Sequence, residues 1–395
     1  MVRLLLPLLC LMTACDTGFP IETVVENLRV LGIRSTPADL HPGETAVLQS
    51  LILDPSLVGQ KPTVLWVGCE PDPYNLNRSA CSDPSVLSDP AALGASDGGL
   101  PPGVKIIGFN DRAAYSASPE VFSVLPADDP RRITGTVGQV LAIAVAEEIS
   151  PAASEAELRA LFDRVQAKTV NSLIALFRIR ISEDPQRNTN PVFGPLTFAG
   201  EALAANATLA LRPGQRGVID IAVADEVFES YTAVTPAGTE QKTERVLAAW
   251  YSSSGRYPVG EYNALREDVK TEFVAPGGTE ATDPMPPRRS GTLYVTLRDT
   301  RGGQSWQTYP FFICDDSLGD PTIASVTWGQ PVLVEGQNLE RVLDVLVDGV
   351  ALKGSYNPST RRWEASPLPL PSGTYPVTVT TRSCSRLDSL SVTVP

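Results

Sequence analysis

The sequence is poor in the residues on which most enzymes and metal proteins depend. It has one histidine, His41, and no Cys-x-x-Cys or Cys/His spacing that would hold zinc. It also lacks a phosphate-binding glycine loop and a dinucleotide-binding glycine motif. His41 lies in a Leu-His-Pro-Gly turn, and a second copy of this turn carries Arg212 instead, so we expect an exposed turn position. We therefore expect no cofactor, no metal site and no catalytic residues.

Positive charge is scarce as well. The chain has 32 lysines and arginines against 45 aspartates and glutamates, which gives a formal net charge of −13. An acidic surface repels phosphate backbones, so nucleic acid is excluded as the expected partner. Beyond the first fifteen residues no segment approaches 18 consecutive apolar residues, and we therefore expect no membrane-spanning helix.

The first fifteen residues have the pattern of a secretion signal. One positive charge, Arg3, precedes the apolar run 4–12, which is too short to span a bilayer of ~30 Å as a helix. Met12-Thr-Ala-Cys15 resembles the lipobox of bacterial lipoproteins, which implies cleavage before Cys15, diacylglycerol carried on its sulfur, and palmitate among the attached lipids. The alternative is an ordinary cleavable signal in which Cys15 is incidental. The resemblance implies a lipid anchor in the bacterial envelope, facing periplasm or cell surface, and leaves open which membrane holds it.

The remaining cysteines favour disulfides. With Cys10 in the leader and Cys15 acylated, four cysteines are left, and an even count outside the cytoplasm favours pairing. Cys69 and Cys81 flank a turn-rich loop, and we expect them to be bonded. Cys314 and Cys384 form the other candidate pair, with a weaker case because they fall in two different predicted domains.

An internal repeat predicts sandwich domains. Leu40-His-Pro-Gly recurs as Leu211-Arg-Pro-Gly at an offset of 171, and in each copy an apolar strand and then a tryptophan follow, Trp66 and Trp250. Immunoglobulin-like sandwiches have the same order of elements: a turn, an apolar strand and then a strand that carries a buried tryptophan. At 395 residues the chain is long enough for several such cores. Its content of 43% hydrophobic and 19% charged residues is typical of a folded globular chain. The predicted fold class is all-β, as tandem immunoglobulin-like sandwiches.

The pattern divides the chain into successive units. We expect a tether at 15–24, a first sandwich at 25–185, a polar linker at 186–202 and a second sandwich at 203–315. One short helix is expected within the first, because Ser154 to Glu157 form a capping box ahead of an apolar face. In the second, Arg301-Gly-Gly is expected to turn a terminal hairpin. Sandwiches joined by such links should form an elongated rod.

The C-terminal residues 320–395 resemble the IPT/TIG family of immunoglobulin-like domains. The resemblance lies in the segments Pro321–Val326, Val332–Leu339, Val345–Gly349, Pro371–Val379 and Leu390–Val394. The family's usual glycine-rich stretch after the first strand is reduced to Trp328-Gly-Gln. The resemblance implies a β-sandwich and leaves the function open.

Other patterns carry little chemistry. Gly94-Ala-Ser-Asp-Gly98 matches the nucleophile-elbow pattern, but it lies in an expected loop and no histidine follows it, so we interpret it as coincidence. Acidic residues cluster at 128–129, 147–148 and 315–320. Paired carboxylates serve glycoside hydrolysis or calcium binding, but the spacing matches no known calcium loop. Calcium near Asp315, Asp316 and Asp320 stays an open alternative.

These observations favour a non-catalytic function. The main hypothesis is an envelope lipoprotein acting as a scaffold or recognition module for an envelope protein or glycan. The alternative is a permanent accessory subunit of an envelope assembly, and a carboxylate-dependent glycan hydrolase comes third. If the units form a rod, the recognition surface is expected on the distal third sandwich or on the loops of the second.

Overall fold

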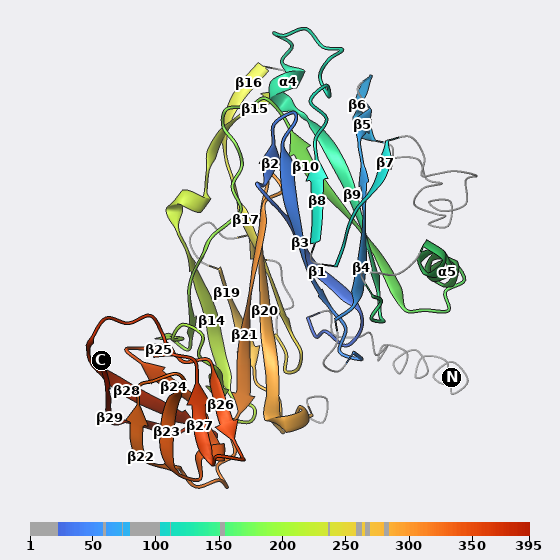
Figure 1. The fold of residues 1–395 in the computed structure, drawn as a ribbon. Coiled ribbons are helices and arrows are strands. Elements are labelled where there is room, and N and C mark those ends of the chain that lie inside the picture. The colour runs from blue at the N-terminus through green and yellow to red at the C-terminus, as the bar shows by residue number, and fades with distance from the viewer. Residues whose placement is uncertain are drawn as a thin grey trace, which may run out of the picture.

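The computed structural model describes residues 23–57, 61–72, 74–79, 103–110, 112–150, 155–235, 238–257, 263–264, 269–279 and 284–395. Strands make up 54% of it and helices 6%, which confirms the predicted all-β class. The strands form three sandwich-like units in chain order, coloured from blue to red in Figure 1.

The first unit is built on one eight-stranded sheet with the order β1-β3-β8-β7-β4-β9-β10-β2. Its two end strands follow each other directly in the chain, so the sheet curls around a core that includes Leu48, Trp66 and Val140. The strands are β1 (Arg29–Thr36), β2 (Asp39–Leu40), β3 (Thr45–Leu53), β4 (Thr63–Cys69), β7 (Val104–Phe109), β8 (Arg112–Ser116), β9 (Thr136–Val145) and β10 (Ser172–Ile181), with a small sheet of β5 (Pro71–Asp72) and β6 (Asn75–Ser79) beside them.

The predicted helix lies between β9 and β10. It is α5 (Glu155–Gln166), and its apolar residues Leu161 and Val165 are buried against Val145 of β9. A shorter helix, α4 (Arg131–Thr134), precedes β9. Since α5 covers part of the sheet with two buried side chains, its apolar face is used for packing within this unit.

The second unit is a sandwich of two sheets. One has the order β12-β11-β14-β19 and the other β13-β21-β20-β17-β18. The strands are β11 (Phe193–Phe198), β12 (Glu201–Ala202), β13 (Leu209–Leu211), β14 (Arg216–Val223), β17 (Val246–Ser252), β18 (Asn263–Ala264), β19 (Val269–Val274), β20 (Ser290–Asp299) and β21 (Gln304–Ile313), with a projecting hairpin of β15 (Ser230–Thr235) and β16 (Gly238–Thr243).

Both Pro-Gly turns of the sequence repeat are present in the structure. Each Pro-Gly turn places a glycine at positive φ, 83° at Gly43 and 66° at Gly214, a conformation that L-residues with a Cβ rarely adopt. Each turn leads into a strand, β3 or β14. A buried tryptophan follows, Trp66 on the next strand β4 at 0% exposure and Trp250 on β17, after the β15–β16 hairpin, at 3%. The predicted terminal hairpin is also present, as β20 and β21.

One expected linker contains a strand. Residues 193–198 fall in the connector expected at 186–202, but they form β11 and pair with β14. The ladder has a bulge between Phe193 and Leu196, which accommodates Gly194 and Pro195. Because these two residues interrupt the apolar pattern, the segment reads as a loop in the sequence.

The third unit pairs two four-stranded sheets around Val334, Trp363 and Val377. It has the β-sandwich architecture that the IPT/TIG resemblance implies, and membership of that family stays a prediction. One sheet has the order β22 (Thr322–Thr327), β23 (Val332–Gln337), β27 (Arg362–Ala365) and β26 (Gly354–Asn357). The other has the order β25 (Val350–Ala351), β24 (Val342–Val347), β28 (Gly373–Thr381) and β29 (Arg386–Val394). Short 3-10 helices in the second and third units are η3 (Asp225–Val227), η4 (Pro287–Arg289) and η5 (Leu339–Arg341).

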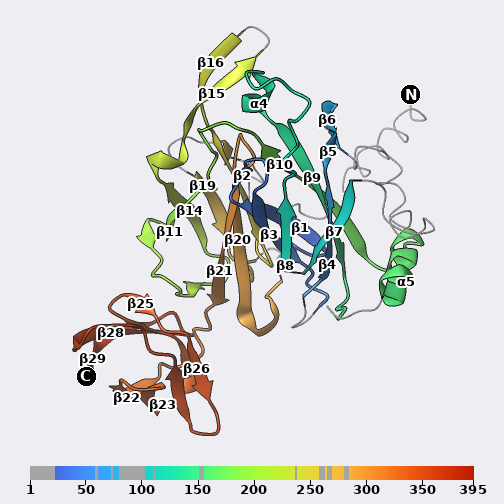
Figure 2. The same cartoon turned by 45° about the horizontal axis from the view of Figure 1, so that its top comes forward.

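The expected rod of three units is wrong. The first two sandwiches lie side by side, and the third projects from one end of the second (Figures 1 and 2). Hydrogen bonds cross between the first two: Ile33 N–H donates to Gln304 Oε1 at 3.1 Å, and Arg298 Nη2 donates to the Leu31 carbonyl at 3.2 Å. These contacts place β1 beside β20 and β21 and bring together residues about 270 positions apart.

Candidate functional site

A buried group of charges holds the first two sandwiches in register. We call it the Arg301 cluster: Arg301, Asp39, Glu229 and Glu244. The Arg301 side chain is 7% exposed, and its nitrogens lie 3.3 to 3.4 Å from oxygens of the three carboxylates. Asp39 belongs to β2 of the first sandwich, whereas the other members belong to the second. The cluster therefore fixes one sandwich against the other, because separating them would strand buried charges.

The carboxylates of the cluster outnumber its one arginine. Arg180 of β10 also pairs with Asp39, at 2.9 Å, which supplies a second positive charge. Burial, reinforced by the nearby Asp299 carboxylate, raises the pKa of Glu244 to about 8. Glu244 therefore holds its proton at neutral pH, which relieves the excess of negative charge.

The turn between β20 and β21 presents Arg301 to this cluster. Asp299 Oδ1 accepts hydrogen bonds from the backbone N–H groups of Arg301 and Gly303, both at 2.8 Å. Asn188 of the connector donates its side-chain amide to Asp299 as well, at 3.2 Å. The turn is thus tied to the connector by Asp299 and Asn188, and β21 begins directly after it beside β1.

A pocket of about 570 Å³ opens where β1 and β3 meet β21, and we call it the Trp306 pocket. Trp306 is half-buried and comes from β21 of the second sandwich, while the other walls come from the first. The lining residues are Arg34, Gln49, Ser50, Ile52, Lys61, Pro62, Thr63, Val64, Asn110, Glu148 and Trp306.

Strand β1 fixes the indole of Trp306. The guanidinium carbon of Arg34 lies 4.6 Å from the ring centroid, which is a cation–π contact. Gly32, on the same face of β1, leaves room for the ring: a Cβ there would lie 3.2 Å from Trp306 Cε3. The ring is therefore held between the sandwiches, with part of its surface lining the pocket.

Polar side chains around the indole are positioned by hydrogen bonds. Arg34 Nε donates to Gln49 Oε1 at 2.7 Å, which orients both side chains. Asn110 accepts from the Val64 N–H at its Oδ1 and from Trp66 Nε1 at its carbonyl, at 2.9 and 2.7 Å. An aromatic surface beside fixed amide and guanidinium groups is suited to a ligand with both apolar faces and hydroxyl groups.

Among the described residues that line the pocket, titratable side chains are few. Its lining contains one carboxylate, Glu148, and neither histidine nor cysteine. The neighbouring Glu147 instead pairs with Arg164 of α5. Glycoside hydrolysis uses two carboxylates that face the same bond, and the described lining contributes one.

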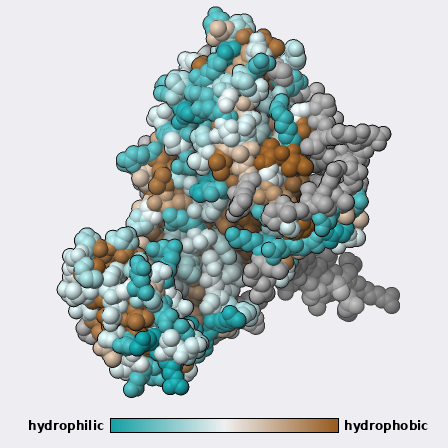
Figure 3. Space-filling view, in the orientation of Figure 1, coloured by the Kyte–Doolittle hydropathy of each residue, from teal (hydrophilic) through white to brown (hydrophobic). Residues whose placement is uncertain are grey.

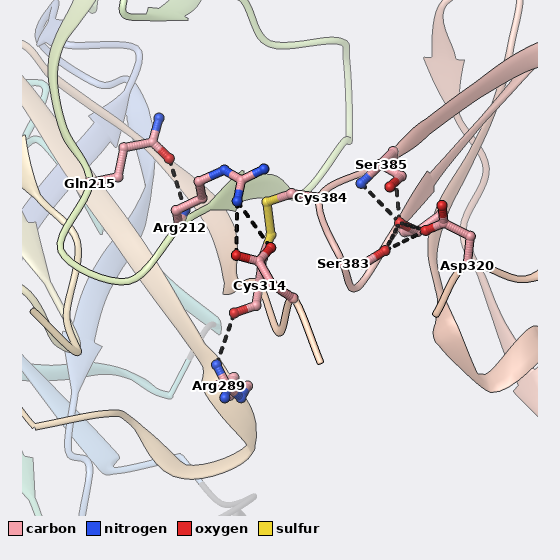
Figure 4. Close-up of a disulfide and its surroundings, with 10 residues drawn as sticks. Arg212, Gln215, Arg289, Cys314, Asp320, Ser383, Cys384 and Ser385 are labelled. Carbon is pink, nitrogen blue, oxygen red and sulfur yellow. Dashed lines mark hydrogen bonds and ion pairs between the residues drawn. A yellow bond between two sulfur atoms is a disulfide. The ribbon is translucent and has the colours of Figure 1, made fainter. Parts of the chain in front are cut away.

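Two of the cysteines expected to pair form a disulfide in the described structure. Cys314, directly after β21, bonds to Cys384 between β28 and β29, with 5.6 Å between their Cα atoms (Figure 4). Arg289 Nη1 donates to the Cys314 carbonyl at 2.9 Å beside it. The bond joins the second sandwich to the third, and it lies away from the Trp306 pocket.

The other sites expected from the sequence fall mostly outside the described residues. Cys15, Cys81 and the segment 94–98 are among them, so lipidation and the Cys69–Cys81 pair stay predictions. Cys69 is buried in β4 and is disulfide-bonded. His41, expected to be exposed, is half-buried with Nε2 3.2 Å from the Asp184 carbonyl, because the connector after β10 folds back over the turn.

The acidic residues at 315–320 point to separate partners. Asp315 pairs with Arg289 at 3.2 Å and Asp316 with Arg212 at 2.9 Å, while Asp320 accepts from Ser383 Oγ at 2.5 Å (Figure 4). Within the described part of the chain, no three His, Cys, Asp or Glu side chains converge as metal ligands. Asp315, Asp316 and Asp320 therefore contact different groups, and calcium at this position stays a prediction.

Sequence reasoning placed Trp306 on a hairpin strand without assigning it a role. Its signal is its register: Ser305 and Phe311 point into the core, so Trp306 points outward. Arg34 and Gln49 carried no signal, because only the packing of two domains brings them to the indole.

Among the described residues, no helix is long and apolar enough to cross a bilayer. Neither a protein-family model nor a curated protein sequence matches the chain. Among solved structures the chain is similar to a Bacteroides ovatus protein, SGBP-B of a mixed-linkage glucan utilization locus in complex with a heptasaccharide, at 12% identity, 95% coverage of this chain, 70% of that chain and a TM-score of 0.16.

Two further solved structures are similar to about half of the chain. The fibronectin(III)-like modules of Clostridium thermocellum CbhA match at 13% identity over 50% of this chain and 93% of that chain, with a TM-score of 0.19. The periplasmic chaperone SfaE matches at 10% identity over 51% and 100%, with a TM-score of 0.24. At these identities and TM-scores the similarities say nothing about function. A function has to be argued from the geometry of this chain.

Proposed function

We propose that this chain is a non-catalytic recognition module of the bacterial envelope that binds a neutral glycan in the Trp306 pocket. The observation that carries the proposal is the half-buried indole of Trp306, fixed by Arg34 and surrounded by Gln49, Ser50 and Asn110. The recognition surface then lies between the first two sandwiches, whereas the expectation of a rod placed it on the third sandwich or on the loops of the second.

The chemistry of the pocket matches that of a sugar ring. A pyranose has an apolar face of C–H groups, and an indole ring offers a flat apolar surface with partial negative charge. The hydroxyl groups around the sugar need donors and acceptors at fixed positions, which the amides of Gln49 and Asn110 supply. Such a site binds through stacking and hydrogen bonds and needs no metal or cofactor.

The charge of the pocket favours a neutral ligand. Arg34 and Lys61 are its positive groups, and Glu148 is its negative group. Arg34 is already engaged with Trp306 and Gln49, and the net charge of −13 for the whole chain repels polyanions. Neutral hexose or pentose polymers therefore fit better than acidic polysaccharides.

The test is retention of the purified full-length protein in native gels that contain a soluble neutral polysaccharide. The panel comprises β-1,4-glucan, β-1,3-glucan, β-1,4-xylan, β-1,4-mannan and α-1,4-glucan. We expect at least one to retard the protein, Trp306→Ala to abolish the retardation, and Trp328→Ala to leave it unchanged. Trp328 is the matched control because it is also half-buried but belongs to the third sandwich. No retardation by any member, or equal retardation of both variants, would refute the proposal.

Anchoring through Cys15 is a separate part of the proposal. It rests on the lipobox-like residues before Cys15 and not on the described structure. We expect Cys15→Ser to abolish incorporation of labelled palmitate and to move the protein from the membrane to the soluble fraction. Unchanged labelling in this variant would contradict the anchor and leave the glycan site untouched.

One observation favours the accessory-subunit alternative. On the face shown in Figure 3, apolar side chains gather on the first sandwich beside the atoms drawn in grey. Several apolar side chains of this sandwich are well exposed, among them Val47 at 53% and Ile106 at 50%. A permanent partner would cover such residues, and a constant stoichiometric protein in crosslinked preparations from the native envelope would support this alternative.

A further inference from the structure

A second pocket adjoins the Trp306 pocket along β21. Its volume is about 640 Å³, and Trp306 lines both pockets. Its long wall is formed by residues 306–310 of β21, and the opposite wall by residues 194–196 and 203–207 of the same sandwich. The two pockets therefore share one lining residue, Trp306, with the first pocket on the side of the first sandwich and the second pocket on the second sandwich.

The edge of β21 in this pocket is without a neighbouring strand in the described structure. On its other side β21 pairs with β20 from Gln304 to Phe312, while β13 reaches only Phe311 to Ile313 on this side. Gln304 N–H donates away from β20, to Asn190 Oδ1 at 2.9 Å. Since backbone groups alternate along a strand, Trp306 and Thr308 also present their N–H and carbonyl groups to the pocket.

Side chains add further polar groups at this edge. Gln307 and Thr308 are exposed, and Tyr309 is half-buried with its hydroxyl donating to Gln307 Oε1. The ring of Tyr309 packs against the core of the second sandwich, so it has one fixed position. The pocket thus combines an aromatic ring, an amide and a free strand edge, which can meet the hydroxyl groups of a sugar.

Building on the proposed glycan site, we infer that the second pocket is a further subsite for the same ligand, and that the ligand is the interior of a linear neutral glycan that crosses Trp306. Because both pockets are lined by Trp306, a ligand that occupies both passes this residue. The chain is therefore recognised along its length and not by its terminus.

A peptide strand added to β21 fits the same edge less well. Proline has no N–H, so Pro310 cannot donate to an added strand. Gln304 N–H is already bonded to Asn190. Only Trp306 and Thr308 then offer both a donor and an acceptor, which is too short a ladder for stable strand addition.

The experiment titrates the full-length protein calorimetrically with linear oligosaccharides of three and of eight sugars, prepared from each of the five polysaccharides named above. We expect the octasaccharide to bind the wild type at least about tenfold more tightly than the trisaccharide. The double variant Gln307→Ala/Thr308→Ala should lose this gain and bind both lengths alike. Val218→Ala, at an exposed position of β14 that lines neither pocket, is the control for folding and should match the wild type.

The outcomes separate this inference from the proposed function. If the trisaccharide binds and Trp306→Ala abolishes binding, but length or the double variant has no effect, the second subsite is refuted and the glycan site stands. If no oligosaccharide binds the wild type, both fail. Selection of an extended peptide at this edge from a display library, with loss of its binding in Thr308→Pro, would overturn the inference in favour of strand addition.

Discussion

At the scale of single residues, burial of charge decides how the first two sandwiches meet. Arg301 and Asp39 are 262 positions apart, yet both are almost fully buried and lie 3.4 Å from each other. A buried charge is tolerated when it is paired. The excess of carboxylates in the Arg301 cluster is accommodated by the raised pKa of Glu244, and this makes the interface sensitive to pH.

The first prediction concerns that sensitivity. The folded protein keeps the Glu244 proton up to about pH 8, whereas the unfolded chain releases it near the ordinary value of 4.5. Between these values the folded state binds more protons, so the contribution of Glu244 to stability falls as the pH rises. The rise in the pKa of Glu244 corresponds to a change of at most roughly 5 kcal/mol in the free energy of unfolding. This is an upper limit, because the Arg301 cluster can relax around the charged form of Glu244.

Urea unfolding at pH 5 to 8.5 measures this effect. We expect Glu244→Gln, which removes the titrating group but keeps its size, to lose less stability than the wild type over this range. Glu340→Gln, a change at an exposed position of the third sandwich, is the control and should follow the wild type. Parallel curves for Glu244→Gln and wild type would contradict the assignment.

At the scale of elements, the turn from β20 to β21 determines where Trp306 stands. Gly303 cannot carry a Cβ without conflict, because the added atom would lie 2.1 Å from Asp299 Oδ2 and 2.8 Å from the Thr189 carbonyl. Its neighbour Gly302 has open space but a φ of 104°. A substitution at Gly303 therefore tests crowding against the connector, whereas the same substitution at Gly302 tests backbone strain alone.

The second prediction compares alanine at these two positions. Gly302→Ala should cost about 1 to 2 kcal/mol of unfolding free energy through backbone strain. Gly303→Ala should cost more, because the added Cβ displaces Asp299 from the backbone N–H groups of Arg301 and Gly303, from which it accepts hydrogen bonds. Chemical denaturation of both variants measures the difference, and a Gly303→Ala variant as stable as Gly302→Ala would show that the turn is not tied to the connector as described.

The fold of the elements was largely predictable from local patterns, and their mutual placement was not. The Pro-Gly turns, the strands after them and the buried Trp66 and Trp250 all follow from short-range alternation. The strand β11 was missed because Gly194 and Pro195 interrupt its apolar pattern. The pocket was missed for another reason. Arg34 and Trp306 come together only because the Arg301 cluster holds the two sandwiches against each other, and local sequence patterns do not predict contacts between residues so far apart in the chain.

At the scale of the whole molecule, the third sandwich is attached by a covalent bond and by a buried polar contact. Thr208 donates its backbone N–H to Asp344 Oδ2 at 2.7 Å, and burial raises the pKa of this carboxyl. Arg382 of the third sandwich lies over Phe312 of β21, 5.2 Å from the ring centroid. These contacts surround the disulfide and give the third sandwich a defined position at the end of the second.

The third prediction removes the covalent bond. The pair Cys314 and Cys384 is separated by 70 residues, for which loop-closure entropy predicts a stabilisation of at most about 4 kcal/mol. We expect Cys314→Ser/Cys384→Ser to lower the unfolding free energy by up to this amount and to leave saccharide binding intact, because the pocket lies between the other two sandwiches. A large loss of binding in the folded double variant would show that the third sandwich belongs to the site.

The central claim, a saccharide bound between the first two sandwiches, is tested most directly by hydroxyl-radical footprinting of tryptophans. Trp306 and Trp328 are both half-buried in one molecule, so Trp328 corrects for radicals consumed by free sugar. With a saturating amount of the polysaccharide that retards the protein, the oxidation rate of Trp306 should fall several-fold while that of Trp328 stays the same. Protection of Trp328 with unchanged oxidation of Trp306 would place the ligand on the third sandwich and contradict the account.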